Sequence, residues 1–241
     1  MTSSLPPSDW APWAAALAGL SLEADFFTRA DRYINALAAA NAELNLTAFD
    51  PRLEGRAHVV DSLQALRGLL DGAASVIDVG TGGGFPGLPV ALARPMLSVT
   101  LLDALRKKQA AVAGVAAAAG AGNAKALWGR AEDMGRDPVH REIYDAALCR
   151  AVGRLPVVLE LTLPLLRVGG RCLLHRGQES KTEIEAAVPH LNSLGARLGD
   201  VFPYRLPGND HDRFLICIEK SDQISNRYPR RPGVPAKRPL W

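Results

Sequence analysis

The residues best placed to do chemistry are an acid and a series of glycines that follow a short apolar run. Asp78 lies near the end of this run, and Gly80, Gly82, Gly84 and Gly87 come directly after it. Glycine tolerates positive φ angles, and it lets a ligand approach the backbone where a side chain would block it. A glycine loop between an apolar strand and a helix is typical of a site for a nucleotide-like cofactor.

Acids also close the next two strand-like runs. Asp103 follows Asp78 by 25 residues, and Ala131, Glu132 and Asp133 follow the third run. An acid at the end of the second strand typically binds the two hydroxyls of a ribose, and the third strand end could meet an adenine edge. One acid at a strand end is more often a helix cap. Three acids in register with a glycine loop instead predict one cofactor lying across a sheet edge.

The glycine spacing alone does not choose the cofactor, because Gly82 to Gly87 formally matches the G-x-G-x-x-G pattern of dinucleotide sites. Asp78 favours a different ligand. An acid beside the loop disfavours an anionic pyrophosphate, whereas S-adenosylmethionine carries a sulfonium and an ammonium group. The sequence also has no phosphate-binding G-x-x-x-x-G-K-[ST] and no Tyr-x-x-x-Lys pair. The residues therefore predict S-adenosylmethionine as the cofactor.

These residues need a sheet to hold them, and the hydrophobic pattern supplies one. Beyond residue 73, apolar runs alternate with helical stretches, which indicates right-handed crossovers and a mostly parallel sheet covered by helices on both faces. We expect an α/β, Rossmann-like class I methyltransferase fold with seven strands. Strands are predicted at 74–79, 98–103, 124–129, 144–149, 171–175, 197–204 and 213–219, and helices at 12–20, 22–40, 53–70, from 87, 106–119, 155–166 and 180–194.

The chain of 241 residues divides on this pattern into three parts. Residues 1–72 form a helical N-terminal extension, residues 73–220 the cofactor-binding domain, and residues 221–241 a basic C-terminal arm. The last fifteen residues contain five basic side chains and no acid, with Tyr228 and Trp241 among them. Such a block is typical of a solvated tail, but it also suits an arm that contacts RNA.

The composition narrows the class of protein. No apolar run is long enough to span a membrane, and residues 1–9 lack the basic and apolar parts of a signal peptide.

 No membrane association is expected, and the predicted location is the cytoplasm. Cys149, Cys172 and Cys217 are scattered through apolar runs, which argues against a disulfide framework or a zinc site. We therefore expect no metal, and we expect the protein to be a monomer.

The stretch after the fourth strand bears on what is methylated. It lacks the Asn/Asp-Pro-Pro-aromatic tetrapeptide typical of enzymes that methylate exocyclic amines, and Cys149 has no Pro-Cys context and is expected to be structural. Arg150 falls at the strand end, where a guanidinium could orient the cofactor or meet a phosphate or base. A ring nitrogen such as guanine N7 has a free lone pair, so it needs alignment with the methyl group but no general base.

Several segments together resemble the bacterial small-subunit ribosomal RNA guanine-N7 methyltransferases, the RsmG or GidB family. The resemblance covers nearly the whole chain, and the Phe-Pro-Gly ending of the glycine loop makes it specific. The other segments that carry it are Asn45-Leu46-Thr47-Ala48, residues 58–63, residues 101–108, Gly129 to Asp133, Arg150-Ala151-Val152 and Arg227 to Gly233.

The resemblance implies methyl transfer from S-adenosylmethionine to N7 of a guanine in the 530 loop of 16S rRNA, on free rRNA, the 30S subunit or an assembly intermediate. It implies that the cofactor contacts Gly80, Phe85, Ala131, Glu132 and Arg150, and that the substrate side holds His58, Asp61 and Ser62. The family commonly has Lys-Gly after the fifth strand, where this chain has Arg176-Gly177. Arg176 keeps the charge but changes the geometry of a contact to RNA.

Two other readings stay open on the residues alone. The glycine loop equally permits a methyltransferase that acts on another RNA or on a small molecule, although the basic C-terminal residues disfavour the latter. A noncatalytic nucleotide-binding or RNA-binding module would bind but transfer no methyl group. Oxidoreduction with NAD is the weakest alternative, because Asp78 disfavours a pyrophosphate.

Overall fold

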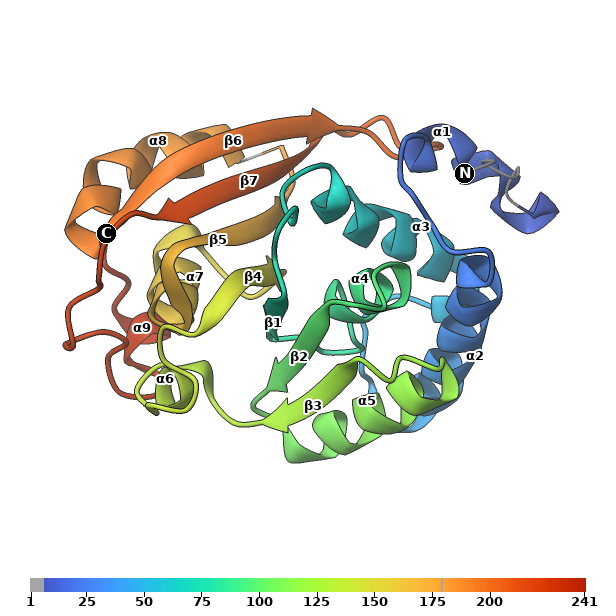
Figure 1. Ribbon diagram of the computed structural model, residues 1–241, viewed down its shortest axis with the longest axis horizontal. Helices are drawn as coiled ribbons and strands as arrows, with labels where there is room; N and C mark the ends of the chain where they lie inside the picture. Colours follow the sequence, from blue (N-terminus) through green and yellow to red (C-terminus); the bar gives the residue numbers. More distant parts are fainter. Residues whose placement is uncertain (1–6, 179) are drawn as a thin grey trace.

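The computed structural model describes residues 7–178 and 180–241 of the chain and consists of one twisted sheet between two layers of helices (Figure 1). The seven strands follow the order β3-β2-β1-β4-β5-β7-β6. Every neighbouring pair from β3 to β5 is parallel, and β7 runs antiparallel to both β5 and β6. This confirms the predicted α/β fold with a mostly parallel seven-stranded sheet. The strands are β1 (Ser75–Val79), β2 (Ser98–Asp103), β3 (Ala124–Trp128), β4 (Tyr144–Arg150), β5 (Leu166–Arg176), β6 (Ala196–Tyr204) and β7 (Arg213–Lys220).

Helices cover both faces of this sheet, as its alternating side chains require. One face packs against α2 (Phe26–Leu44), α3 (Pro51–Leu63), α4 (Gly87–Ala93) and α5 (Arg106–Ala118). The other face packs against α6 (Ala131–Met134), α7 (Leu155–Thr162) and α8 (Ser180–Leu191), with α9 (Val234–Lys237) beside α7. The short α1 (Ala14–Leu17) follows a 3₁₀ turn at Ser8–Trp13.

The N-terminal helices share the core of the sheet. Phe26, Tyr33 and Leu37 of α2 are fully buried, and they belong to one apolar cluster with Leu88 of α4 and Val99 of β2. The boundary predicted near residue 72 therefore marks where the sheet begins, while the apolar core continues across it. Figure 1 shows α2 beside α5, along the edge of the molecule that holds β3.

Some element bounds differ from the sequence prediction for local reasons. Helix α3 begins at Pro51 because Asp50 caps it, accepting a hydrogen bond from Arg52 N at 2.9 Å. Helix α2 extends to Leu44, where Asn45 adopts a left-handed conformation and ends the helix. Strand β5 begins at Leu166, five residues before the predicted start, since the glycines at 169 and 170 do not interrupt it.

The C-terminal residues pack against the body of the protein. Arg230 makes an ion pair at 2.6 Å with Glu160 of α7, whose side chain is fully buried. Tyr228 is also buried, and Arg141 donates hydrogen bonds to the carbonyl oxygens of Tyr228 and Ile224. The basic segment thus has fixed contacts near α6 and α7 (Figure 1). In the described part of the chain, no helix is long and apolar enough to cross a membrane.

Candidate cofactor and substrate site

The glycine loop lies at the carboxyl end of β1, with its backbone turned toward the neighbouring strand. Gly80, Gly82 and Gly84 have φ angles of 74°, 54° and 102°, the left-handed region that glycine adopts without strain. The amides of Gly80 and Thr81 both donate to the carbonyl oxygen of Leu102, at 2.9 and 3.0 Å. This pairing holds the loop at the edge of β2, next to Asp103.

Asp78 supports the loop from beneath. Its Oδ2 accepts hydrogen bonds from Thr81 Oγ1 at 2.7 Å and from Gly87 N at 2.8 Å, so it joins the start of the loop to the start of α4. The residue is fully buried, and burial raises the pKa of its carboxyl to about 6 despite these hydrogen bonds. Its Oδ1 has no hydrogen-bond partner among the described residues. A cationic ligand over the loop would stabilise the ionised carboxyl.

Asp103 and Glu132 lie at the two strand ends that the sequence singled out. Asp103 accepts from Gly82 N at 3.1 Å and from Leu105 N at 2.8 Å, so its carboxylate is oriented by the glycine loop and by its own turn. Glu132, in the first turn of α6 beside Ala131, accepts from Gly233 N at 2.9 Å. The contact between Glu132 and the C-terminal segment is one that the sequence did not predict.

Together these groups suit S-adenosylmethionine. Two carboxylates, one under the loop and one at the end of β2, match a cationic methionine end and a ribose. Gly82 suits the close approach of another group to its backbone. A Cβ at this position would lie 3.4 Å from the carbonyl oxygen of Leu46 and would also need a strained φ. The individual contacts of Asp78, Gly80, Gly82, Phe85, Asp103, Ala131 and Glu132 to the cofactor stay predictions.

A cavity of about 460 Å³ opens between the glycine loop and the loop after α2. Its walls include Thr47, Phe49, His58, Phe85 and Arg150. The rings of Phe49 and His58 stack with centroids 3.7 Å apart, and the guanidinium carbon of Arg150 lies 4.8 Å from the centroid of the Phe85 ring. The cavity therefore has glycines on one side and aromatic rings on another, and the cations Arg150 and Arg213 also line it.

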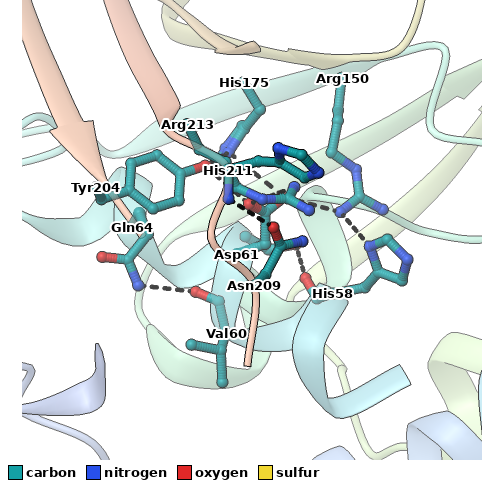
Figure 2. Close-up of polar contacts among 11 residues, drawn as sticks. His58, Val60, Asp61, Gln64, Arg150, His175, Tyr204, Asn209, His211 and Arg213 are labelled. Carbon is teal, nitrogen blue, oxygen red and sulfur yellow. Dashed lines mark hydrogen bonds and ion pairs between the residues drawn. The ribbon is translucent and has the colours of Figure 1, made fainter. Parts of the chain in front are cut away.

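Arg150 links this cavity to a buried charged cluster centred on Asp61 (Figure 2). Its Nη1 lies 3.0 Å from Asp61 Oδ2 and 3.1 Å from His58 Nδ1. The other carboxylate oxygen, Oδ1, accepts from Tyr204 Oη at 2.8 Å and from Arg213 Nη1 at 3.2 Å. We define these residues, with His175, as the Asp61 cluster. They come from α3, β4, β5, β6 and β7.

The cluster fixes the charges of its members. Burial opposes ionisation of Asp61, but His175 and the two guanidinium groups hold the pKa of its carboxyl below the ordinary value. Burial and Arg150 lower the pKa of His58 to about 4, and burial lowers that of His175 to about 4 as well. Both imidazoles are therefore neutral at pH 7, and Asp61 is a carboxylate.

The structure brings together some of the predicted substrate-side side chains, whereas the hydroxyl of Ser62 is bound within α3. His58, Asp61 and Arg150 are in direct contact, and Arg176 lines a smaller cavity beside Asp61. Ser62 is fully buried, and its hydroxyl donates to the carbonyl oxygen of His58 at 2.7 Å, one helical turn earlier. Its hydroxyl is thus used inside α3. Its predicted place on the substrate side stays a prediction.

Sequence reasoning missed three members of the Asp61 cluster. His175, Tyr204 and Arg213 lie 114 to 152 residues from Asp61 in the chain, on strands whose alternation gave no sign of a shared site. Phe49 was missed too, although it directly follows the Asn-Leu-Thr-Ala segment. The one available signal was a polar side chain at or next to a terminus of three successive strands: His175 near the end of β5, Tyr204 at the end of β6 and Arg213 at the start of β7.

The cysteines have no place in this site. Cys149, Cys172 and Cys217 are buried free thiols. Burial raises the pKa of Cys149 well above its ordinary value and that of Cys172 to about 12, so neither is a thiolate at neutral pH. Within the described ranges, no group of three or more His, Cys, Asp or Glu residues is arranged to hold a metal ion.

Comparison with known proteins identifies the family of this chain. Residues 27–201 match the family model described as GidB, rRNA small subunit methyltransferase G. A "Ribosomal RNA small subunit methyltransferase G" from Deinococcus radiodurans is 44% identical over 212 residues, which cover 87% of this chain and 84% of the relative. The protein of that name from Carboxydothermus hydrogenoformans is 39% identical over 225 residues, covering 92% of this chain and 95% of the relative.

Solved structures support the fold. An O-methyltransferase from Bacillus cereus in complex with SAH superposes with a TM-score of 0.55 at 18% identity, over 78% of this chain and 90% of that chain. A 16S rRNA (adenine(1408)-N(1))-methyltransferase from Catenulisporales acidiphilia gives a TM-score of 0.52 at 17% identity, over 63% of this chain and 87% of that chain. The fold is that of class I methyltransferases, and the cofactor is S-adenosylmethionine. The chain belongs to the rRNA small subunit methyltransferase G family, and it is an rRNA methyltransferase.

Proposed function

We propose that this protein transfers a methyl group to N7 of a guanine in the 530 loop of 16S rRNA, acting in the cytoplasm as a monomer on the 30S subunit or its rRNA. Membership of the rRNA small subunit methyltransferase G family supports the substrate class. The choice of N7 rests on the resemblance described above and on the chemistry of the site.

The observation that carries the choice of N7 is the state of Asp61. This carboxylate lines the smaller cavity, and both of its oxygens are held by Arg150, Tyr204 and Arg213. A carboxylate paired in this way is a weak base, because proton uptake would break its ion pairs. Guanine N7 carries a free lone pair and releases no proton when it is methylated. The site therefore suits a nucleophile that needs orientation and exclusion of water.

Each residue of the site would have a separate role in binding the cofactor or the RNA. S-adenosylmethionine supplies the methyl group when it is bound. Asp78 and the glycine loop would hold the methionine end, Asp103 the ribose, and Ala131 and Glu132 the adenine. Arg150 would lie between cofactor and guanine, with His58 and Asp61 fixing its position. Arg176 and the basic C-terminal residues would contact the RNA backbone.

The proposal is tested by mapping the product. Purified protein is incubated with methyl-labelled S-adenosylmethionine and either 30S subunits or free 16S rRNA that lacks the modification. Nuclease digestion and mass spectrometry then identify and locate the methylated nucleoside. We expect 7-methylguanosine in the 530 loop. A different product, or label at another position, would contradict the proposed target, and label in neither RNA would contradict the substrate class.

The cofactor role of Asp103 has its own test. We expect Asp103→Ala to weaken S-adenosylmethionine binding at least about tenfold, because a charge-assisted hydrogen bond is lost. Calorimetry measures the affinity, and a thermal melt checks that the protein is folded. Asp71→Ala, at an exposed turn before β1, is the matched control and should leave the affinity unchanged. Equal affinities for the two variants would remove Asp103 from the ribose site.

A further inference from the structure

A second cavity, of about 270 Å³, adjoins the cavity beside the glycine loop, at the carboxyl ends of β4 and β5. Asp61, Arg150, His175, Arg176, Tyr204 and Arg213 line it, and Arg150 and Arg213 also line the cavity beside the glycine loop. A group bound in this second cavity would therefore lie directly beside the glycine-loop cavity. Its volume is close to the lower end of the range of about 300–1,000 Å³ that is usual for small-molecule sites.

Three of the residues that line this cavity each have one buried nitrogen atom without a hydrogen-bond partner in the described part of the chain. They are His175 Nε2, Arg176 Nε and Arg213 Nε. Arg176 Nε lies 3.5 Å from a carboxylate oxygen of Glu183, and its Nη2 donates to the carbonyl oxygen of Gly153 at 2.7 Å. Buried polar atoms without partners are uncommon in folded proteins and call for an explanation. The ion pair with Glu183 accounts for Arg176 Nε, whereas His175 Nε2 and Arg213 Nε, on two residues that line the same cavity, point to a polar ligand.

The hydrogen bonds within the Asp61 cluster decide what these atoms offer. Tyr204 donates its hydroxyl hydrogen to Asp61, so its oxygen is left to accept from His175 Nδ1 at 3.3 Å. A neutral imidazole with its hydrogen on Nδ1 has a free lone pair on Nε2. The two guanidinium nitrogens are donors in every state. The cavity thus combines donors with one acceptor.

This combination distinguishes a base edge from a phosphate. Phosphate oxygens only accept hydrogen bonds, and they would repel the lone pair of His175 Nε2. The guanine edge next to N7 presents O6, an acceptor, followed by N1–H, a donor. Adenine presents the opposite pattern at these two positions, an amino group and an unprotonated N1. Donors from arginine and an acceptor from histidine therefore match guanine and mismatch adenine.

We propose that this second cavity binds the O6 and N1–H edge of the target guanine, with Arg213 or Arg176 donating to O6 and His175 Nε2 accepting from N1–H. The inference rests on the proposed function, since it assigns the guanine-recognition site of the same reaction. His175 is then a specificity residue, and Tyr204 is a positioning residue that fixes its tautomer. Asp61 holds both Tyr204 and Arg213 in place.

The test pairs a change in the base with a change in the enzyme. RNA carrying 2-aminopurine at the target position keeps N7 but lacks O6 and N1–H, whereas inosine keeps all three. With wild-type enzyme we expect inosine to react within about threefold of guanine and 2-aminopurine to react at least about tenfold more slowly. Tyr204→Phe, which removes only the hydroxyl, should slow the methylation of guanine and leave the methylation rate of 2-aminopurine unchanged. We expect the same two results for His175→Phe.

A matched control removes a similar tyrosine–histidine contact away from the site. Tyr144→Phe loses the contact between Tyr144 Oη and His140 Nδ1, which are 2.9 Å apart, and should keep the wild-type preference for guanine. Calorimetry with S-adenosylmethionine checks that each variant is folded. If Tyr204→Phe and His175→Phe slow guanine and 2-aminopurine by the same factor, His175 does not read the base and the inference fails.

A phosphate in the cavity would give a different result. Loss of a phosphate contact in Arg213→Gln lowers the slope of log affinity against log salt by about one, whereas loss of a base contact leaves the slope unchanged. A lowered slope would overturn the inference. The proposed function is judged separately, by whether wild-type enzyme forms 7-methylguanosine on unmodified RNA.

Discussion

At the scale of single residues, Asp78 supports the fold of the glycine loop and is also a predicted cofactor residue. It is fully buried and holds the glycine loop through Thr81 and Gly87, yet its Oδ1 lacks a hydrogen-bond partner among the described residues. Burial raises the pKa of the carboxyl from 3.8 to about 6. Above this pH, the ionised carboxylate therefore lowers the stability of the folded protein without cofactor.

Asp78→Asn tests this cost. Between about pH 4 and pH 6 the unfolded chain has lost the proton that the folded protein still holds, so stability falls as the pH rises and the full cost remains above pH 6. We expect the variant without cofactor to be more stable than the wild type at pH 8, by up to about 3 kcal/mol, and equally stable near pH 4. It should bind S-adenosylmethionine more weakly.

Denaturant unfolding at the two pH values measures the stabilities, and calorimetry measures the affinity. Thr81→Val removes one hydrogen bond to the same carboxylate but keeps the charge, so it serves as the comparison and should destabilise the protein at pH 8. A variant Asp78→Asn that is less stable than the wild type at pH 8 would contradict the predicted cost of ionisation.

At the scale of elements, the C-terminal segment joins α6 and α7. Arg230 donates to Glu160 of α7 through its backbone amide and its guanidinium, at 2.6 to 2.8 Å. Three residues later, Gly233 N donates to Glu132 of α6. Because Glu132 lies at the predicted adenine site, we expect the segment to border that site whether or not it also contacts RNA.

Arg230→Ala tests this link. It leaves the carboxylate of Glu160 buried without its ion pair, and we expect a loss of about 3 kcal/mol in the free energy of unfolding. Release of the segment should also weaken S-adenosylmethionine binding in the absence of RNA. Arg231→Ala, which removes a neighbouring exposed cation, should change neither quantity. Chemical denaturation and calorimetry provide the two measurements, and similar results for both variants would show that the segment is independent of the site.

At the scale of the whole molecule, the N-terminal helices and the glycine loop form one unit. Tyr33 of α2 donates its hydroxyl hydrogen to the carbonyl oxygen of Gly83 at 3.0 Å. A Cβ at Gly83 would lie 2.6 Å from Thr47 Cγ2 and 3.0 Å from Leu37 Cδ1. The cofactor loop is therefore packed directly against a segment that precedes the sheet.

Gly83→Ala tests this packing, because the new methyl group must displace Thr47 or Leu37. We expect a loss of about 1–3 kcal/mol in stability and weaker S-adenosylmethionine binding. Gly114→Ala is the matched control, since this exposed helical glycine has no atom within 4 Å of the new Cβ. The control should stabilise the protein by about 0.5–1 kcal/mol. Unchanged stability and affinity in Gly83→Ala would show that the two segments are not coupled.

The sequence determined the features that depend on neighbouring residues. Apolar runs predicted the strands, and the glycines and Asp78 predicted the cofactor loop, because backbone conformation and strand burial are set within a few residues. The alternation of strands and helices, with the right-handed crossover rule, predicted a mostly parallel sheet. The order of its strands was seen only in the structure. Helix ends were less well predicted, as in α2 and α3, because capping by Asn45 and Asp50 decided them.

Only the tertiary structure decided which charged side chains meet. Asp61 contacts Arg213 across 152 residues of sequence and Tyr204 across 143, and no local pattern encodes such a pairing. The same is true of Glu132 and Gly233, which lie 101 residues apart. The charge of a buried group depends on the desolvation and the partners that the fold supplies. The sequence therefore predicted the cofactor loop, whereas the fold decided the hydrogen-bonding pattern of the cavity beside it.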